Sequence, residues 1–260
     1  MPTLPFPLIG PTYTNRSLPV ASQVTRNFYV EVNPMGTEVS SFMPFPGLKP
    51  FATTGSGVNR GTGLYDGRLY TVTDDKLYRV NANGSSSVIG TVGGATRCSF
   101  ADDGINLVIA NGVGKPYAYD GSSLVQGTNV NLPNASTVAY INRRVVYDGA
   151  GADVVFADLD DPLEVDSLNL IKADAKADAT IAVHAHRQQL DVFGEDSIQP
   201  MYNTGTGNPP FDFILNSVQE IGLGAIHSIA SNKNYVYFIG SDRQIYRKTG
   251  LDLQSISNPA

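Results

Sequence analysis

The sequence predicts an all-β fold, a β-propeller whose blades are each about 40 residues long. Two observations carry this prediction. One hairpin pattern recurs five times at a near-constant interval, and the composition suits short strands joined by tight turns. The 26 glycines and 16 prolines favour turns, while the 13 tyrosines and 11 phenylalanines favour strands, so we expect few long helices.

Each repeat is an apolar strand, a polar turn and a second strand that carries an aromatic residue. The first strands begin at Leu69, Leu107, Arg144, Leu190 and Val236, which gives spacings of 38, 37, 46 and 46 residues. A leucine-rich solenoid lacks such hairpins, and a sandwich need not repeat one hairpin at a near-constant spacing. Propellers use roughly 4 to 8 blades, so five recognisable blades form either a compact ring or an incomplete one that continues beyond the given chain.

Residues 1–55 are predicted to be an N-terminal extended arm, and residues 56–260 the propeller blades. The arm is rich in proline, which cannot donate to the ladder of a central strand. Its apolar run over residues 42–46 either docks on a partner or caps the core. The partner-binding candidates in this run are Phe42, Met43 and Phe45.

The net charge of −6 is concentrated in one stretch, Asp153 to Asp178, which holds eight acidic residues and two lysines. Either this stretch is a solvated surface or it is an acidic patch facing a partner, with Asp158, Asp160 and Asp161 as candidates. Its second half, from Ser167, fits either a short helix capped by that serine or an irregular connection between blades.

Composition and charge also argue against several partners. Lysines and arginines are scattered singly, so we expect no sequence-specific nucleic-acid binding. Apolar runs fall short of the roughly 18 residues that a membrane span needs, and the first residues do not resemble a signal peptide. The single cysteine, Cys98, leaves no internal disulfide and no cysteine-based metal cluster.

No constellation of residues points to catalysis or to a cofactor. A Gly-x-Ser-x-Gly elbow and a phosphate-binding Gly-x-x-x-x-Gly-Lys-Ser/Thr loop are both missing. His184 and His186 would share one face of a strand, but no third ligand is fixed nearby by spacing. The carboxylates from Asp158 to Glu164 could hold calcium, although the ordered spacing of a calcium loop is missing. We therefore expect no enzyme, no metal and no cofactor; the alternative is a glycan-binding or glycan-cleaving propeller.

Several stretches along the chain occur in a characteristic order and spacing. They are Arg26 to Pro34, Pro46-Gly47-Leu48, Arg60-Gly61, Lys76-Leu77-Tyr78, Ala157 to Pro162, Ser167-Leu168-Asn169, Val192-Phe193-Gly194, Tyr202 to Gly205, Pro210-Phe211, Ile221-Gly222-Leu223-Gly224, Ile245 to Gly250 and Gln254 to Ser257. Together they resemble the packaged-DNA stabilisation proteins, the tail-hub family of short-tailed phages. The chain departs from the family in lacking tryptophan and in ending where members usually continue with further blades.

This resemblance implies a structural virion protein without catalytic residues. Members of the family form a hexameric hub below the portal and adaptor rings, where they retain the packaged DNA. The resemblance thus implies as partners the tail adaptor and portal ring proteins, the tail needle or tailspike proteins, and further copies of the chain. It also implies a location in the virion, at the portal vertex of the tail, after synthesis in the host cytoplasm.

Overall fold

The computed structural model describes residues 26–32 and 40–257. The chain divides into two compact units, Met1–Phe51 and Ala52–Ala260. Within the described part of the first unit, strands β1 (Phe28–Val32) and β2 (Ser40–Pro44) form one antiparallel hairpin. No helix occurs among the residues described in either unit, and hence none that could cross a membrane.

The second unit contains five antiparallel sheets of four strands each, joined in sequence order. Blade 1 comprises β3 (Asn59–Tyr65), β4 (Arg68–Thr73), β5 (Lys76–Val80) and β6 (Ser86–Thr91). Blade 2 comprises β7 (Ser99–Asp102), β8 (Leu107–Ala110), β9 (Tyr117–Tyr119) and β10 (Leu124–Gln126). Blade 3 comprises β11 (Val138–Ile141), β12 (Arg144–Asp148), β13 (Asp153–Phe156) and β14 (Leu170–Lys172). Blade 4 comprises β15 (Thr180–His186), β16 (Gln189–Gly194), β17 (Ile198–Asn203) and β18 (Phe211–Phe213). Blade 5 comprises β19 (Ala230–Ser231), β20 (Val236–Ile239), β21 (Ile245–Thr249) and β22 (Asp252–Ser255).

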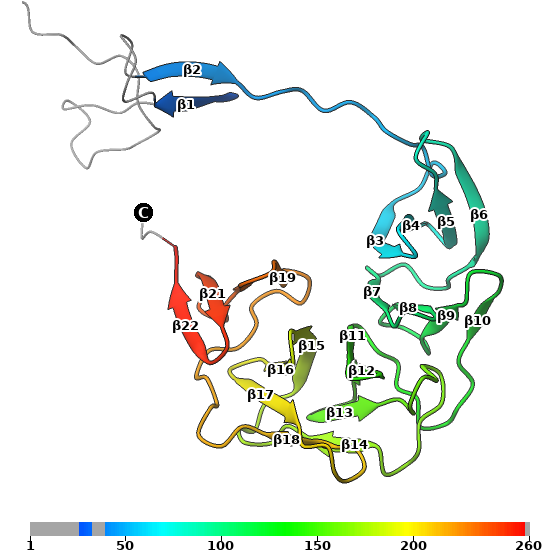
Figure 1. Cartoon of the computed structure of the whole chain (residues 1–260), viewed down its shortest axis with the longest axis vertical. Coiled ribbons are helices and arrows are strands. Elements are labelled where there is room, and N and C mark those ends of the chain that lie inside the picture. Colours follow the sequence, from blue (N-terminus) through cyan, green and yellow to red (C-terminus); the bar gives the residue numbers. More distant parts are fainter. Residues whose placement is uncertain (1–25, 33–39, 258–260) are drawn as a thin grey trace, which may run out of the picture. The chain divides into compact units, whose positions relative to one another are not determined.

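The blades are arranged as in a β-propeller, which confirms the predicted fold. The first strand of each blade lies toward the centre and the fourth lies outside (Figure 1), and β7 contacts both β3 and β11. The hairpin that recurs in the sequence is the pair formed by the second and third strands of each blade, β4–β5 through β20–β21. The repeat was visible because the second strand of blades 1 to 4 is a largely buried, mostly apolar run.

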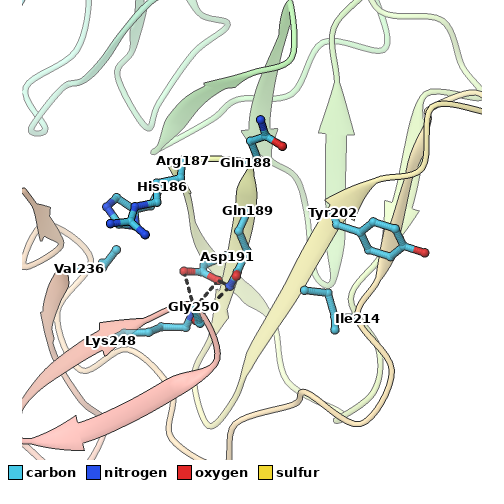
Figure 2. Close-up of a pocket in the computed structure, with 10 residues that line it drawn as sticks. All are labelled: His186, Arg187, Gln188, Gln189, Asp191, Tyr202, Ile214, Val236, Lys248 and Gly250. Atoms are coloured by element: carbon cyan, nitrogen blue, oxygen red, sulfur yellow. Dashed lines mark hydrogen bonds and ion pairs between the residues drawn. The ribbon is translucent and has the colours of Figure 1, made fainter. Parts of the chain in front are cut away.

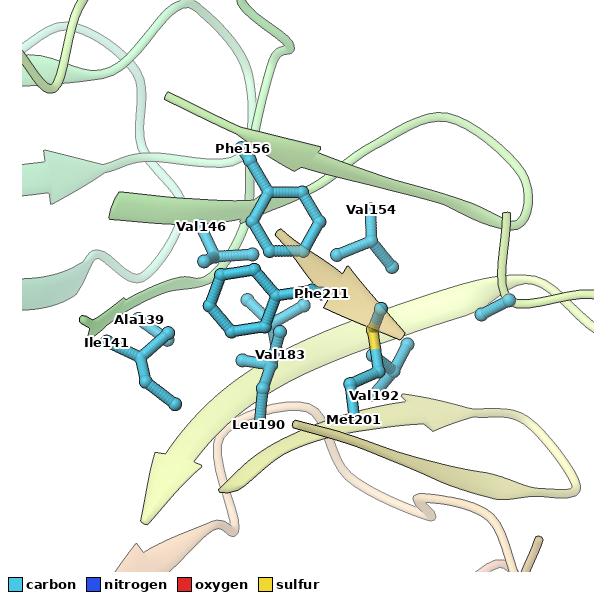
Figure 3. Packing of buried hydrophobic residues seen from close by; sticks show 11 residues of the cluster. Ala139, Ile141, Val146, Val154, Phe156, Val183, Leu190, Val192, Met201 and Phe211 are labelled. Carbon is cyan, nitrogen blue, oxygen red and sulfur yellow. The ribbon is translucent and has the colours of Figure 1, made fainter. Parts of the chain in front are cut away.

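Both faces of a central blade are buried, which explains the nearly continuous apolar strands. In β12, Val145 and Tyr147 pack toward blade 2, whereas Val146 packs toward blade 4. Figure 3 shows the second of these layers, where Phe156 of blade 3 stacks on Phe211 of blade 4 with ring centroids 4.8 Å apart. Four such apolar clusters join consecutive blades among residues 52–257, and none of them joins blade 1 to blade 5.

The stretch from Ser167 to Asp178 contains no helix, so the helix alternative is wrong. Leu170–Lys172 is the outer strand of blade 3 and pairs with β13. The chain then leaves the sheet through Ala173, whose N–H donates to the carbonyl of Ala152, and continues irregularly to β15. Pairing with an available sheet edge satisfies these main-chain groups as well as a short helix would, and it completes the blade.

Candidate functional site

The β1–β2 hairpin exposes apolar side chains on both of its faces. Two aromatic pairs span it: Phe28 with Phe42, at a centroid distance of 6.2 Å, and Tyr29 with Phe45, at 5.3 Å. Phe45 is 60% exposed, and Phe42 and Met43 are 36% and 39% exposed. An isolated two-stranded hairpin is marginally stable in water, and among the described residues this apolar surface is left exposed.

The three candidate carboxylates of the acidic stretch each have a separate partner. Asp160 pairs with the guanidinium of Arg143, and this hydrogen bonding lowers the pKa of Asp160. Asp158 accepts a hydrogen bond of 2.6 Å from the Asn169 amide, and Asp161 accepts one of 3.2 Å from the N–H of Leu163. The structure therefore brings the three residues together in one tight turn, where the N–H of Asp161 donates to the carbonyl of Asp158, but each side chain has its own hydrogen-bond partner.

The acidic loop nevertheless borders a hollow on the propeller surface. Asp160 and Asp161 line it together with Asp120, and its volume is about 340 Å³. Within residues 26–32 and 40–257, no group of three histidine, cysteine or acidic side chains is placed to hold a metal ion. The loop thus contributes carboxylates to the wall of this hollow.

A second hollow, of about 300 Å³, lies between blades 4 and 5 (Figure 2). At its base Lys248 donates hydrogen bonds of 2.8 and 2.9 Å to the two carboxylate oxygens of Asp191, and a third of 2.6 Å to the carbonyl of Gly250. Both charged side chains are 2% exposed. All three ammonium protons are engaged, so neither residue is free to act as a base or a nucleophile.

A third cavity, of about 360 Å³, follows the propeller axis. The first strands of blades 1 to 4 and the segment before β19 contribute to its wall. Its charged and titratable groups include Arg97, Asp102, His184 and His227. Burial lowers the pKa of both histidines below the ordinary value, which favours neutral imidazoles.

Sequence reasoning placed His184 and His186 on one strand face but did not foresee their different surroundings. His184 lies in the wall of the axial cavity, where its buried Nε2 atom has no hydrogen-bond partner among the residues that the structure describes. His186 lies in the hollow between blades 4 and 5, with its Nε2 atom 2.9 Å from the carbonyl oxygen of Asn232. Arg97 and His227 were not singled out, because their convergence depends on ring geometry and not on sequence spacing.

Comparisons with known proteins give a family and a fold. The family model described as "Bacteriophage P22 Gp10, beta-propeller" matches residues 4–250. Among curated proteins, none matches the chain. YCF48 from Cyanidioschyzon merolae is similar in structure at 12% identity and a TM-score of 0.54, over 81% of this chain and 73% of that one.

Two further solved structures are similar at comparable identity. YCF48 bound to D1 peptide matches at 13% identity and a TM-score of 0.53, over 81% of this chain and 68% of that one. BamB from Moraxella catarrhalis matches at 12% identity and a TM-score of 0.48, over 74% of this chain. The match spans 59% of the BamB chain. At such identities the similarity to YCF48 shows the fold alone.

Proposed function

The chain belongs to the family of the bacteriophage P22 Gp10 β-propeller, phage proteins that stabilise packaged DNA, and from this premise we propose that it is a structural protein of the virion tail. In this proposal copies of the chain form a hexameric hub below the portal and adaptor rings. The hub retains the packaged genome and anchors the tail needle or tailspikes. It works through protein interfaces and catalyses no reaction.

The observation that carries the proposal, beside family membership, is the apolar β1–β2 hairpin. Phe28, Tyr29, Phe42, Met43 and Phe45 are each more than one-third exposed. Leaving a surface of this kind in water is unfavourable, since its burial contributes about 25 cal/mol per Å². A rigid propeller joined to an apolar hairpin suits assembly, because the hairpin can add strands to, or pack against, a neighbouring protein.

The glycan alternative has less support from the axial cavity. A glycan site would place several aromatic side chains beside carboxylates at one mouth of the propeller. The described wall holds one aromatic residue, Phe100, and one carboxylate, Asp102. That carboxylate accepts a 2.8 Å hydrogen bond from the N–H of Gly104 in its own turn, which directs it toward the loop.

The test compares two triple variants for capture by a purified portal–adaptor assembly. In the first, Phe42, Met43 and Phe45 are replaced by serine. In the second, three exposed leucines of the propeller, Leu64, Leu168 and Leu215 (66%, 73% and 88% exposed), are replaced by serine as a matched control. We expect the wild type and the control to be captured and the hairpin variant to be lost from the complex, while circular dichroism shows intact blades.

Two results would overturn parts of the proposal. Capture of the hairpin variant at wild-type level would remove the hairpin from the interface and leave the hub role standing. Failure of the wild type to bind the portal–adaptor assembly at any concentration up to about 100 μM, well above ordinary protein affinities, would refute the hub role itself.

A further inference from the structure

Arg97 stands at one mouth of the axial cavity without a compensating acid. It lies two residues before β7, and its side chain lines the cavity wall. None of the ion pairs found among residues 26–32 and 40–257 involves it. An arginine without a carboxylate partner at the mouth of a polar cavity is a ready donor of two parallel hydrogen bonds to an oxyanion.

His227 lies close enough to Arg97 for the guanidinium charge to lower the pKa of the imidazole, in addition to the lowering by burial. The two residues come from opposite ends of the repeat, blade 2 and the segment leading into blade 5. Only the propeller geometry brings them to one mouth. The guanidinium of Arg97 and a protonated imidazole of His227 repel each other, and no acid beside them offsets this repulsion. A bound anion would offset it.

A hydroxyl donor adds to the site. The inner edges of the first strands are partly occupied already, since the N–H groups of Val138 and Val183 donate to the hydroxyls of Ser99 and Thr137. Ser99 lies at the start of β7 beside Arg97, and its Oγ atom already accepts a 3.2 Å hydrogen bond from the N–H of Val138. Its hydroxyl proton therefore remains free to be donated.

The acids near the axis do not neutralise this mouth. Asp102 lies at the opposite end of β7 from Arg97, which at about 3.3 Å per residue places the two more than 10 Å apart along the strand. Asp191, which faces His184 across β15 and β16, is bound by Lys248. Burial is the main cause that lowers the pKa of His184; the Asp191 carboxylate opposes this lowering, and His186 and Lys248 add to it.

We infer that the axial cavity binds a doubly charged oxyanion of the phosphate or sulfate class between Arg97 and His227. Arg97 supplies a permanent charge, the Ser99 hydroxyl supplies a hydrogen bond, and His184 adds to the field once it is protonated. The inference does not depend on the tail-hub role, since it rests on the cavity alone.

Protonation of the two histidines couples binding to pH. Both pKa values lie below the ordinary value in the free protein, and a bound dianion favours the protonated forms. The affinity for the anion should therefore rise as the pH falls toward 5.5. Sulfate is the suitable probe, because its charge does not change over this range, whereas phosphate itself titrates near neutral pH.

The experiment is a titration with sulfate at pH 7.5 and at pH 5.5, at constant ionic strength, followed by the imidazole resonances of the full chain. We expect saturable shifts of the His227 signals and tighter binding at the lower pH. Arg97→Gln should weaken binding by about tenfold or more, the loss typical of a charge-assisted hydrogen bond. Arg243→Gln, an exposed arginine on the turn between β20 and β21, is the matched control and should bind as the wild type.

Three outcomes would overturn the inference. The first is the absence of saturable shifts. The second is an equal loss of sulfate affinity in both arginine variants, which would indicate general charge screening. The third is loss of sulfate binding at the lower pH. A further arm compares inorganic phosphate with a short oligonucleotide that carries or lacks a 5′-phosphate. Binding of the phosphorylated oligonucleotide alone would assign the site to a DNA end, and binding of inorganic phosphate would assign it to the free anion.

Discussion

Lys248 of blade 5 and Asp191 of blade 4 form an ion pair in which both side chains are 2% exposed and the shortest Nζ to Oδ distance is 2.8 Å. Gln189 donates a further hydrogen bond of 2.6 Å to the same carboxylate. The pair lies at the base of the hollow in Figure 2, beside the apolar cluster that joins the two blades. A buried pair of this kind contributes little net stability, but it penalises any packing of blade 5 that leaves one charge alone.

Removing one partner of this pair should be strongly destabilising. We expect Lys248→Met to lower the free energy of unfolding by about 3–5 kcal/mol, because Asp191 is then left as an uncompensated buried charge. The double variant Asp191→Leu/Lys248→Met should regain most of that loss. Urea denaturation measures both, and Lys172→Met, which breaks the exposed pair with Asp153, should change stability by less than about 1 kcal/mol. A double variant no more stable than the single one would contradict this account.

Local hairpins could be predicted from the sequence, whereas strands that depend on distant parts of the chain could not. The second and third strands of each blade were predictable, because each hairpin is local and its apolar pattern repeats. The outer strands were not, since segments such as Leu170–Lys172 become strands only when an adjacent sheet edge is available. The run Ile221 to Gly224, part of the family resemblance, needs glycine at two positions. A Cβ atom on Gly222 would meet the main chain of Glu195, and one on Gly224 would meet that of Gly240.

The candidate sites divide in the same way. Phe42, Met43 and Phe45 were identifiable as an apolar run whatever structure they adopt. In contrast, Lys248 lies 57 residues from Asp191 along the chain. Arg97 precedes β7 of blade 2, whereas His227 lies in the segment before β19 of blade 5. Side chains that meet only through the arrangement of blades leave no signal in sequence spacing, so the sequence predicts neither the interblade pair nor the axial cavity.

Arg60 should be the most sensitive arginine of blade 1. It is 3% exposed and donates hydrogen bonds of 2.7 to 2.9 Å to the carbonyls of Thr96, Asp74, Val92 and Gly93. We expect Arg60→Met to destabilise the protein by about 3 kcal/mol or more, since several buried carbonyls lose their donor.

Arg60→Lys should fall between the wild type and Arg60→Met, because an ammonium group cannot reach all four carbonyls. The exposed Arg243→Met serves as control and should stay within about 0.5 kcal/mol of the wild type. Chemical denaturation followed by tyrosine fluorescence reports all three. Equal stability of Arg60→Met and Arg243→Met would show that the hydrogen bonds to these carbonyls make no net contribution to the free energy of unfolding.

His184 should make stability depend on pH below its ordinary pKa of 6.5. Burial lowers the pKa in the folded state, so the unfolded chain takes up a proton at a pH where the folded protein does not. The free energy of unfolding should therefore fall as the pH decreases below 6.5, and His184→Gln should reduce this dependence. Urea midpoints between pH 7.5 and 5.5, in buffers free of phosphate and sulfate, test the prediction, with His227→Gln measured in parallel. An unchanged slope in His184→Gln would exclude His184 as a source of the effect.

Thr137 should couple blade 3 to blade 4 through its hydroxyl. Its Oγ1 atom donates to Asp148, at 3.0 Å, and accepts from the N–H of Val183 in β15, also at 3.0 Å. Burial raises the pKa of Asp148, and the bonds from Thr137 and Ser136 oppose that rise. We expect Thr137→Val to cost about 1–3 kcal/mol and Thr137→Ser to retain most of the stability.

The effect of Thr137 should also depend on pH. Because the pKa of Asp148 is raised in the folded state, ionising this carboxyl as the pH rises lowers the free energy of unfolding. The ionised carboxylate depends more on the hydrogen bond from Thr137 than the neutral acid does, so Thr137→Val should cost more at pH 7 than at pH 4. Hydrogen exchange of the Val183 amide should accelerate in Thr137→Val and not in Thr137→Ser; equal protection in both would show that the hydroxyl does not link the blades.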